Sequence, residues 1–379
     1  MRILIYDEKL SGHHLEYLQH YCQAAKNMCD DEFIICVPQV DYNAKKDYLP
    51  SSSEDNNISY DLIPDTEVQR ILSGSPVRYG YRKAVSVADK AKKNNIDYVF
   101  LTDFITTIPF LLFLMPKGVK VRGIIYRIYL YLKGKISPLR YAFDTVCFWL
   151  MAKSYVMDRV FILNDESSAK RLNSIHHTDK FMALADPVTD IDSTKLKNMR
   201  DEMNVPVGNT IYFHFGALAE RKGTLEILKA IILADSNTLN KKTFIFAGVV
   251  RNDIREQFYS LLDIAKNKVQ IIVFDEFCSY EKLNCLCYTS DVILMPYRQT
   301  ELSSGVLGYA AQLGKPVIGP KDGLIGKLIL ENNLGAVLKD VTASGIFDAL
   351  ISPVPKHLPS EYVERNSKKN FINTLWNGI

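Results

Sequence analysis

The sequence predicts an α/β protein of two domains, each built on a parallel sheet whose strands are connected by helices. Three observations predict this fold class. Short apolar runs alternate with stretches of helical periodicity along both halves of the chain, which is the pattern of β–α–β units. The length of 379 residues exceeds what one ordinary core supports. A polar, charged segment that ends in Pro206 and Gly208 separates the two series of strands.

The first domain is expected to span residues 1–187. Its expected strands are the short aliphatic and aromatic runs at residues 3–6, 33–37, 98–101, 119–125 and 159–163. Its expected helices have apolar positions at helical spacing and lie at residues 15–29 and 139–157, with a third, of mixed charge, ending near residue 94. Residues 41–75 are rich in Ser, Asp and Asn and are expected to be mostly loop.

The second domain is expected to span residues 188–358. Its expected strands are again short apolar runs, at residues 210–215, 243–247, 269–273, 291–295 and 316–318. Helices are expected between them, at residues 224–234, 281–289 and 306–313. Ser360 is a suitable N-cap for a last helix within residues 359–379, which we expect to pack back on the first domain.

The composition excludes several classes of protein. A chain with 47% hydrophobic and 23% charged residues is globular rather than disordered or fibrous. Lys+Arg 46 against Asp+Glu 43 is close to balance, so the net charge gives no case for a nucleic-acid partner. The 7 cysteines form no C-x-x-C pair and are expected to be reduced thiols. With no long apolar run and no signal peptide, the expected location is the cytoplasm.

One window, residues 104–143, contains no acidic residue. It combines cations with aromatic side chains: Lys117, Lys120, Arg122, Arg127, Lys133, Lys135 and Arg140 with Phe104, Phe110, Phe113, Tyr126, Tyr129, Tyr131 and Tyr141. This composition is typical of a face that rests on an anionic membrane surface, which would make the protein peripheral on the inner face of the plasma membrane. An alternative stays open, in which the apolar residues are core and the cations only solvate its edges.

Two polar turns of the first domain follow expected strands, where ligands of parallel sheets bind. Gly12 lets the backbone approach a ligand closely, and His13 and His14 can hydrogen-bond a hydroxyl or move a proton. The alternative is that one histidine caps the next helix and the other is on the surface. Asp103 stands at the end of the strand at 98–101, where an ordinary loop aspartate is an equally open interpretation.

Two turns of the second domain have the composition of an anion site. Gly216 ends a strand, and Arg221 and Lys222 follow it just before a helix, as suits a diphosphate. The second turn combines an acid, two hydroxyls and a helix start: Glu301, Ser303, Ser304, Gly305 and Val306. The carboxylate would repel a phosphate, so we expect it to accept hydrogen bonds from sugar hydroxyls.

Taken together and in order, these motifs resemble the GT-B glycosyltransferases. Residues 210–340 are similar to the second domain of retaining glycosyltransferase family 4. The matching segments are Lys222-Gly223, Ala247-Gly248, residues 288–296, the Glu301 loop and residues 313–319. The segment Ser11-Gly12-His13-His14 is similar to the glycine-rich first loop of the same family. The resemblance implies two Rossmann-like domains that face each other across a cleft.

The resemblance also implies roles for individual residues. Lys222 matches the lysine that binds the donor diphosphate; the family's arginine falls on Ala217, and Arg221 is the candidate substitute. Glu301 matches the first glutamate of the E-x7-E element, which holds donor sugar hydroxyls, while Tyr309 occupies the place of the second, which binds ribose. Gly12 and Gly216 are further expected donor contacts, and Glu276 and Phe277 are expected near the base. The residues expected around the diphosphate are Ser303, Ser304, Gly305 and Val306.

The implied activity is transfer of a sugar from a UDP- or GDP-linked donor to a saccharide or lipid-linked saccharide, in surface polysaccharide or glycolipid synthesis. Family members retain the anomeric configuration, so the resemblance implies front-face attack without metal or another cofactor. We expect His13 or Asp103 to orient the acceptor hydroxyl or take its proton. His14 and Arg127 are the expected acceptor contacts.

Two alternatives stay open. A GT-B epimerase would need several acid/base carboxylates, of which Glu301 and Asp103 are the obvious ones. A degenerate, non-catalytic subunit that binds sugar nucleotides would explain Ala217 and Tyr309. A nucleotide-dependent oxidoreductase is disfavoured because no G-x-G-x-x-G follows the first strand, and a phosphorylase usually has a far longer chain.

Overall fold

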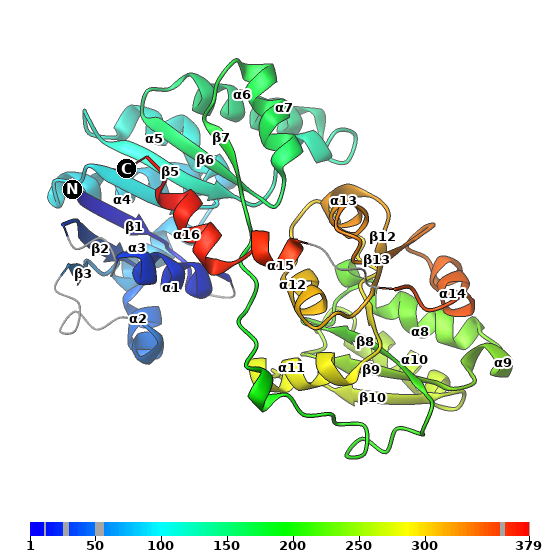
Figure 1. Ribbon diagram of the computed structural model, residues 1–379. Coiled ribbons are helices and arrows are strands. Elements are labelled where there is room, and N and C mark those ends of the chain that lie inside the picture. The colour runs from blue at the N-terminus through cyan, green and yellow to red at the C-terminus, as the bar shows by residue number, and fades with distance from the viewer. Residues whose placement is uncertain (11–12, 26–29, 50–56, 357–360, 379) are drawn as a thin grey trace. The chain divides into compact units, whose positions relative to one another are not determined.

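A computed structural model describes residues 1–10, 13–25, 30–49, 57–356 and 361–378 (Figure 1). The chain forms two compact units, which are Met1–Ala185 with Lys368–Ile379, and Asp186–Ser367. The chain therefore passes between the units twice, after Ala185 and after Ser367. Each unit is a parallel sheet with helices, so the predicted α/β fold class is confirmed.

Unit 1 contains a sheet of seven parallel strands in the order β3-β2-β1-β4-β5-β6-β7. The strands are β1 (Arg2–Tyr6), β2 (Glu32–Cys36), β3 (Ile58–Tyr60), β4 (Tyr98–Thr102), β5 (Lys120–Ile125), β6 (Met157–Leu163) and β7 (Phe181–Leu184). The helices are α1 (His13–Ala25), α2 (Gln39–Lys45), α3 (Asp65–Leu72), α4 (Pro76–Lys93), α5 (Ile108–Leu114), α6 (Pro138–Lys153), α7 (Glu166–His176) and α16 (Lys368–Trp376), with short 3₁₀ turns η1 (Lys46–Tyr48), η2 (Ile105–Thr107) and η3 (Tyr129–Tyr131).

Unit 2 contains a sheet of six parallel strands in the order β10-β9-β8-β11-β12-β13. The strands are β8 (Thr210–Phe215), β9 (Lys242–Ala247), β10 (Gln270–Phe274), β11 (Val292–Leu294), β12 (Val317–Pro320) and β13 (Gly335–Leu338). The helices are α8 (Thr224–Leu233), α9 (Ser236–Leu239), α10 (Arg255–Lys266), α11 (Tyr280–Thr289), α12 (Gly305–Gln312), α13 (Gly323–Glu331), α14 (Ala343–Ile351) and α15 (Tyr362–Arg365), with η4 (Ser193–Lys195) and η5 (Glu220–Lys222).

Both sheets have the strand order of a Rossmann fold, with one further strand, β7, in unit 1. In this order the chain starts in the middle of the sheet, runs to one edge and then returns to the other side. The direction reverses between β1 and β4 in unit 1 and between β8 and β11 in unit 2. Ligands of such sheets bind beyond the carboxyl ends of the strands at this switch point. Functional side chains are therefore expected at these two places.

The last helix, α16, completes the core of unit 1. Its apolar residues Phe371, Leu375 and Trp376 are buried against one face of the sheet, where Phe371 stacks on Tyr17 of α1. In Figure 1, α16 (red) lies beside α1. The other face is covered by α4, α5 and α6. The two faces of the sheet therefore bury separate clusters, one of which depends on the C-terminal residues.

A buried arginine holds the end of α16. Arg122 of β5 is 1% exposed and donates to the carbonyl oxygens of Leu375 at 3.1 Å, Asn377 at 2.9 Å and Gly378 at 3.1 Å. Its Nε also pairs with the Asp158 carboxylate at 2.5 Å. The guanidinium satisfies carbonyls that a helix leaves unbonded at its C-terminus, where a positive charge is also favourable.

The sequence interpretation missed several elements. Residues 41–75 were expected to be mostly loop, but they contain β3, α3 and most of α2. That expectation was wrong because these elements are short and bury few residues, chiefly Ile58 and Ile71. The expectation for strands also left out β7 and β13, which are four-residue edge strands. The six cysteines of the described part are all buried: Cys22, Cys36, Cys147, Cys278, Cys285 and Cys287.

The acid-free window 104–143 is only partly a surface. Phe104, Tyr129 and the guanidinium of Arg122 are buried, so these three belong to the core and not to a membrane-facing set. Their inclusion in that set was wrong, because Phe104 and Tyr129 pack in the core on one face of the sheet and Arg122, on β5, binds the carbonyl oxygens at the end of α16. Phe113 is 83% exposed at the end of α5, and Lys117, Lys133 and Lys135 are exposed. In the described part of the chain no helix is long and apolar enough to cross a membrane.

We predict that Arg122→Met destabilises unit 1 by roughly 2–4 kcal/mol, because the last carbonyls of α16 lose a buried charged donor. Both tryptophans, Trp149 and Trp376, lie in unit 1, so urea unfolding followed by tryptophan fluorescence reports on this unit. Arg159→Met is the matched control, since its side chain is 31% exposed and its partner Asp179 is 3.9 Å away. The control should change stability by less than about 0.5 kcal/mol. Equal effects of the two variants would contradict the prediction.

Candidate functional site

The turn after β8 brings backbone unusually close to backbone. Gly216 ends this strand with φ +94°, and Gly248 ends the neighbouring β9 with φ +131°. A Cβ atom added to Gly248 would lie 2.0 Å from the carbonyl oxygen of Gly216, where no side chain fits. The two strand ends can therefore meet only because residue 248 is glycine, and the positive φ of residue 216 also favours glycine.

Lys222 occupies the space beside Gly216. The residue is 9% exposed, and its ammonium donates to the carbonyl oxygen of Phe215 at 3.4 Å. A Cβ on Gly216 would come within 2.5 Å of Nζ. The ammonium also lies 5.0 Å from the ring centre of Tyr297, which is a favourable position for a cation over an aromatic ring. The positive charge is thus fixed at the carboxyl end of β8, the switch point of unit 2.

His214 holds this turn in place from the interior of the sheet. Its Nδ1 is 2.9 Å from the carbonyl oxygen of Leu294 on β11, so Nδ1 carries the hydrogen and donates it. Its Nε2 is 3.0 Å from the hydroxyl of Thr224, and that hydroxyl accepts from the amide of Ala219 at 3.1 Å. Burial lowers the pKa of His214 to about 4, so the ring is neutral at physiological pH.

The loop of residues 295–304, here the β11–α12 loop, is fixed to the same turn. The amides of Arg298 and Gln299 donate to the carbonyl oxygen of Arg221 at 2.9 and 3.3 Å. The Arg298 guanidinium pairs with the buried carboxylate of Glu226 at 2.6 Å and with Glu220 at 3.1 Å. Further along, the carbonyl oxygen of Thr300 accepts from the amide of Leu324 in α13 at 2.8 Å.

The expected diphosphate residues lie at the end of this loop, where α12 begins. Ser304 is the N-cap, with no side-chain cap bond, and Gly305 and Val306 open the helix. The first amides of a helix have no partner within it and point toward an anion. Ser303 donates its hydroxyl hydrogen to the Asp186 carboxylate at 2.8 Å, and Glu301 is half-buried beside it in the sequence.

The other expected donor residues of unit 2 differ in exposure. Arg221 is exposed, unlike Lys222. Tyr309 is 8% exposed and packs edge-on against Phe215, with ring centres 5.6 Å apart. Glu276 pairs with Lys282 at 2.5 Å, and the neighbouring Phe277 is 87% exposed. The structure therefore places Lys222, the β11–α12 loop and the start of α12 at the switch point, whereas Glu276 and Phe277 follow β10 at the sheet edge.

At the switch point of unit 1, a buried carboxylate orients His14. Asp7 follows β1 and is 4% exposed; its Oδ2 lies 2.6 Å from His14 Nδ1 and accepts from the Thr102 hydroxyl at 2.8 Å. Burial of His14 disfavours its protonation, but the hydrogen bond and charge of Asp7 outweigh this and raise its pKa. Because Asp7 binds Nδ1, the other ring nitrogen is directed away from the carboxylate on a side chain that is 23% exposed.

Beside this pair, a second acid is neutralised in the interior. Glu8 and Lys83 of α4 form an ion pair at 2.8 Å, with side chains 3% and 1% exposed. Burial alone would raise the pKa of Glu8, but Lys83 and the Tyr79 hydroxyl bound to the carboxylate lower it. Lys83 also donates to the carbonyl oxygens of Thr102 at 3.1 Å and Asp103 at 3.4 Å. The ion pair therefore joins the carboxyl ends of β1 and β4.

Sequence reasoning missed Asp7, Glu8 and Lys83. Asp7 and Glu8 follow an expected strand directly, which is the signal that singled out Asp103, so the same rule would have found them. Asp103 itself is exposed, with φ +43°, and its amide donates to the carbonyl oxygen of Ile124 at 3.0 Å. Arg127 is half-buried just after β5.

The first-loop residues are only partly described. His13 is the first residue of α1. Gly12 and the side chain of His13 lie outside the described part, so their expected contacts stay predictions. Among the described residues, no group of three or more His, Cys, Asp or Glu side chains is placed to hold a metal ion.

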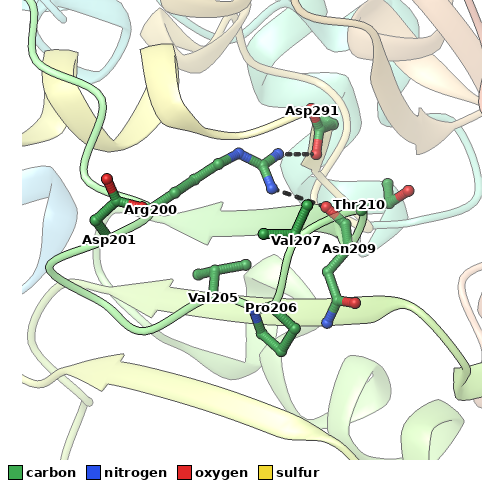
Figure 2. A pocket seen from close by; sticks show the side chains of 9 residues that line it. Arg200, Asp201, Val205, Pro206, Val207, Asn209, Thr210 and Asp291 are labelled. Carbon is green, nitrogen blue, oxygen red and sulfur yellow. Dashed lines mark hydrogen bonds and ion pairs between the residues drawn. The ribbon is translucent and has the colours of Figure 1, made fainter.

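A hollow of about 470 Å³ lies at the amino ends of β8 and β11, on the far side of the sheet of unit 2 from the switch-point site (Figure 2). It is lined by the segment before β8 and by Asp291 before β11. Its charges pair internally, since Arg200 binds the Asp291 carboxylate at 2.6 Å and the carbonyl oxygen of Asn209 at 2.8 Å. Asp291 also accepts from the amide of Ile211 at 2.7 Å. The bonds of Arg200 and Asp291 therefore fix the segment of residues 200–209 to the sheet. This hollow does not belong to the switch-point site.

Comparison with solved structures identifies the fold. WaaG, a glycosyltransferase involved in lipopolysaccharide biosynthesis, matches with a TM-score of 0.66 over 100% of both chains at 12% identity. The α,α-trehalose 6-phosphate synthase of Burkholderia multivorans matches with a TM-score of 0.67 over 98% of this chain and 96% of that one, also at 12% identity. The fold is GT-B.

A third GT-B structure was solved with ligands. HepE of Anabaena, in complex with UDP and glucose, matches with a TM-score of 0.61 over 99% of this chain and 95% of its own, at 13% identity. No protein-family model and no curated protein matches the sequence. At these identities the likeness shows the GT-B fold, and the activity has to be argued from the chain's own residues.

We predict that His214 makes unit 2 less stable in acid. Its pKa is about 4 in the folded chain and 6.5 ordinarily, so the unfolded chain binds the proton more readily and stability falls between pH 6.5 and 4. Relative to His214→Gln, the wild type should lose up to roughly 3 kcal/mol over this range, measured by urea unfolding and circular dichroism. His177→Gln, at an exposed position in unit 1, is the control. Identical pH profiles for wild type and His214→Gln would contradict the assignment.

Proposed function

We propose that the chain is a glycosyltransferase that moves a sugar from a nucleoside-diphosphate sugar to a saccharide acceptor. The observation that carries the proposal is the buried Lys222 ammonium at the switch point of unit 2, next to a loop that leads into the start of α12. A fixed cation and the free amides of a helix start are complementary to a diphosphate. The likeness to HepE, which was solved with UDP-glucose, supports a UDP-linked donor, with a GDP-linked donor as the next to test.

The proposed reaction retains the anomeric configuration. The bond between the sugar C1 and the diphosphate oxygen breaks, the acceptor oxygen bonds to C1 on the same face, and the acceptor proton passes to the leaving phosphate. Negative charge develops on that phosphate, and Lys222 and the amides of Gly305 and Val306 would stabilise it without a metal ion or other cofactor. Glu301 would accept hydrogen bonds from the donor sugar hydroxyls.

The acceptor is assigned to unit 1. His14, oriented by Asp7, presents one ring nitrogen to a hydroxyl and so can bind and position the attacking group. Asp103 and Arg127 lie at the ends of the neighbouring strands β4 and β5 and are the further candidates for acceptor contacts. A saccharide or lipid-linked saccharide, as used for surface polysaccharide or glycolipid, is the proposed acceptor class.

We expect Lys222→Ala to lower kcat/KM at least about 100-fold, because the leaving diphosphate loses its buried cation. Lys229→Ala is the matched control: its side chain is 40% exposed on the following helix, and its loss should change kcat/KM less than about threefold.

A thermal-shift screen of UDP- and GDP-sugars finds the donor, and proton NMR of the product gives its anomeric configuration. Turnover of a nucleotide sugar without an acceptor would favour an epimerase. Unchanged activity of the Lys222→Ala and Glu301→Ala variants would favour a non-catalytic subunit.

We also propose that unit 1 rests on an anionic lipid surface through α5, α6 and the segment between them. Phe113, Leu139 and Trp149 are exposed by 83%, 85% and 51%, and Lys117, Lys133 and Lys135, in the segment between α5 and α6, are also exposed. The acidic residue of α6 that ends the window, Asp144, is buried and pairs with Arg140 at 3.0 Å, so it does not oppose this positive face. Exposed apolar side chains combined with exposed lysines match the composition that binds the boundary of an anionic bilayer.

This surface predicts binding to vesicles that contain phosphatidylglycerol at low salt. Leu139→Glu and Trp149→Glu should each lower the vesicle-bound fraction severalfold in a sedimentation assay, since each places a negative charge against the lipid. Val207→Glu, at a fully exposed position in unit 2, is the control and should bind like the wild type. If the wild type stays in the supernatant with these vesicles, the membrane proposal is wrong.

A further inference from the structure

The first residues of unit 2 run along α12 from its start to its end. Residues 186–189, here the linker strap, contact the helix or its approach at three successive places. The Asp186 carboxylate accepts the Ser303 hydroxyl hydrogen at 2.8 Å, and the Gln312 amide donates to the carbonyl oxygen of Thr189 at 2.5 Å. Between them, Val188 packs against Gly308 so closely that an added Cβ would lie 3.0 Å from its Cγ1.

The second passage of the chain between the units is tied to the same strap. Asn366 is fully buried, its side-chain amide donates to the carbonyl oxygen of Asp186 at 2.9 Å, and its own carbonyl oxygen accepts from the amide of Val188 at 2.8 Å. The helix just before it, α15, packs on α12. The strap directly follows the first passage, after Ala185, and Asn366 directly precedes the second, after Ser367. Both covalent connections are thus held on one helix.

The strap also determines which hydrogen-bond donors of the β11–α12 loop can bind a ligand. A hydroxyl has one hydrogen to donate, and Ser303 directs it to a carboxylate, which makes the bond charge-assisted. The loop therefore presents the backbone amides at the start of α12 to an anion, in an orientation fixed by Asp186. A change in this loop on binding would be passed through Asp186 to Val188 and Asn366.

We propose that Asp186 and Asn366 are positioning residues for the diphosphate-binding loop, and that a nucleoside diphosphate on this loop tightens both chain connections between the units. This inference rests on the proposed function for the identity of the ligand. The link between strap and loop is a property of the protein alone.

Hydrogen exchange of the full chain tests the link with and without UDP, in peptides that cover residues 186–190, 299–306 and 364–369. Without UDP, Asp186→Ala should speed exchange in all three peptides at least about tenfold, because the half-buried hydrogen bond from Ser303 to the Asp186 carboxylate is lost. Asp186→Asn keeps an oxygen that accepts from Ser303 and should stay within about threefold of the wild type. Asp253→Ala, an exposed carboxylate of the same unit, is the control. Gly308→Val, which displaces Val188 and leaves Asp186 intact, should reproduce the faster exchange.

UDP should slow exchange in all three peptides of the wild type but only in the loop peptide of Asp186→Ala. In the transfer assay, Asp186→Ala should raise the KM for the donor about tenfold with kcat within about threefold, and Asp186→Asn should restore the KM. The inference is overturned if Asp186→Ala and Asp253→Ala exchange alike at the loop. If neither UDP nor GDP binds the wild type, the proposed function and the ligand-induced tightening are both wrong, while the ligand-free comparison still decides whether the strap positions the loop.

Discussion

The close approach of two strand ends at Gly216 and Gly248 is the constraint on which the donor side depends. Without side chains at these positions, the turn after β8 folds tightly enough for the Lys222 ammonium to sit directly over Gly216. The carbonyl oxygen of Arg221, the residue before Lys222, accepts from two amides of the β11–α12 loop, and His214 connects the same turn to β11. A side chain at Gly216 would displace the Lys222 ammonium, and one at Gly248 would displace the backbone of Gly216.

The same topology is stabilised in a different way in unit 1. In unit 2 the strand ends meet at glycine residues. In unit 1 a buried ion pair, Glu8–Lys83, lies between the ends of β1 and β4. Such a pair costs desolvation, and the hydrogen bonds from the Tyr79 hydroxyl to Glu8 and from Lys83 to the Thr102 carbonyl oxygen offset part of that cost. The neighbouring carboxylate of Asp7 accepts from the Thr102 hydroxyl and orients His14.

The sequence was sufficient for the α/β class, for the long strands and for the positions of Lys222 and of the start of α12 beyond the carboxyl ends of their strands, because strand–glycine–helix patterns are local. It was insufficient wherever a role depends on a distant contact. Ser303 looked like part of a phosphate cradle, yet its hydroxyl is directed to Asp186, more than a hundred residues earlier in the chain. Arg122 looked like a surface cation, yet its partners are carbonyls at the far end of the chain. The small edge strands β3, β7 and β13 have too few buried positions to produce a recognisable pattern.

The position of α16 sets an order of events during synthesis. The sheet of unit 1 leaves the ribosome first, but Phe371, Leu375 and Trp376, which cover one of its faces, are made only after all of unit 2. At roughly 5–20 residues per second, the part of that face that α16 covers stays exposed for on the order of ten seconds or more. The second unit, contiguous in the chain, can complete its own core in that interval. The half of the molecule that is made first is therefore the half that finishes folding last, and during this delay it is the part most in need of a chaperone.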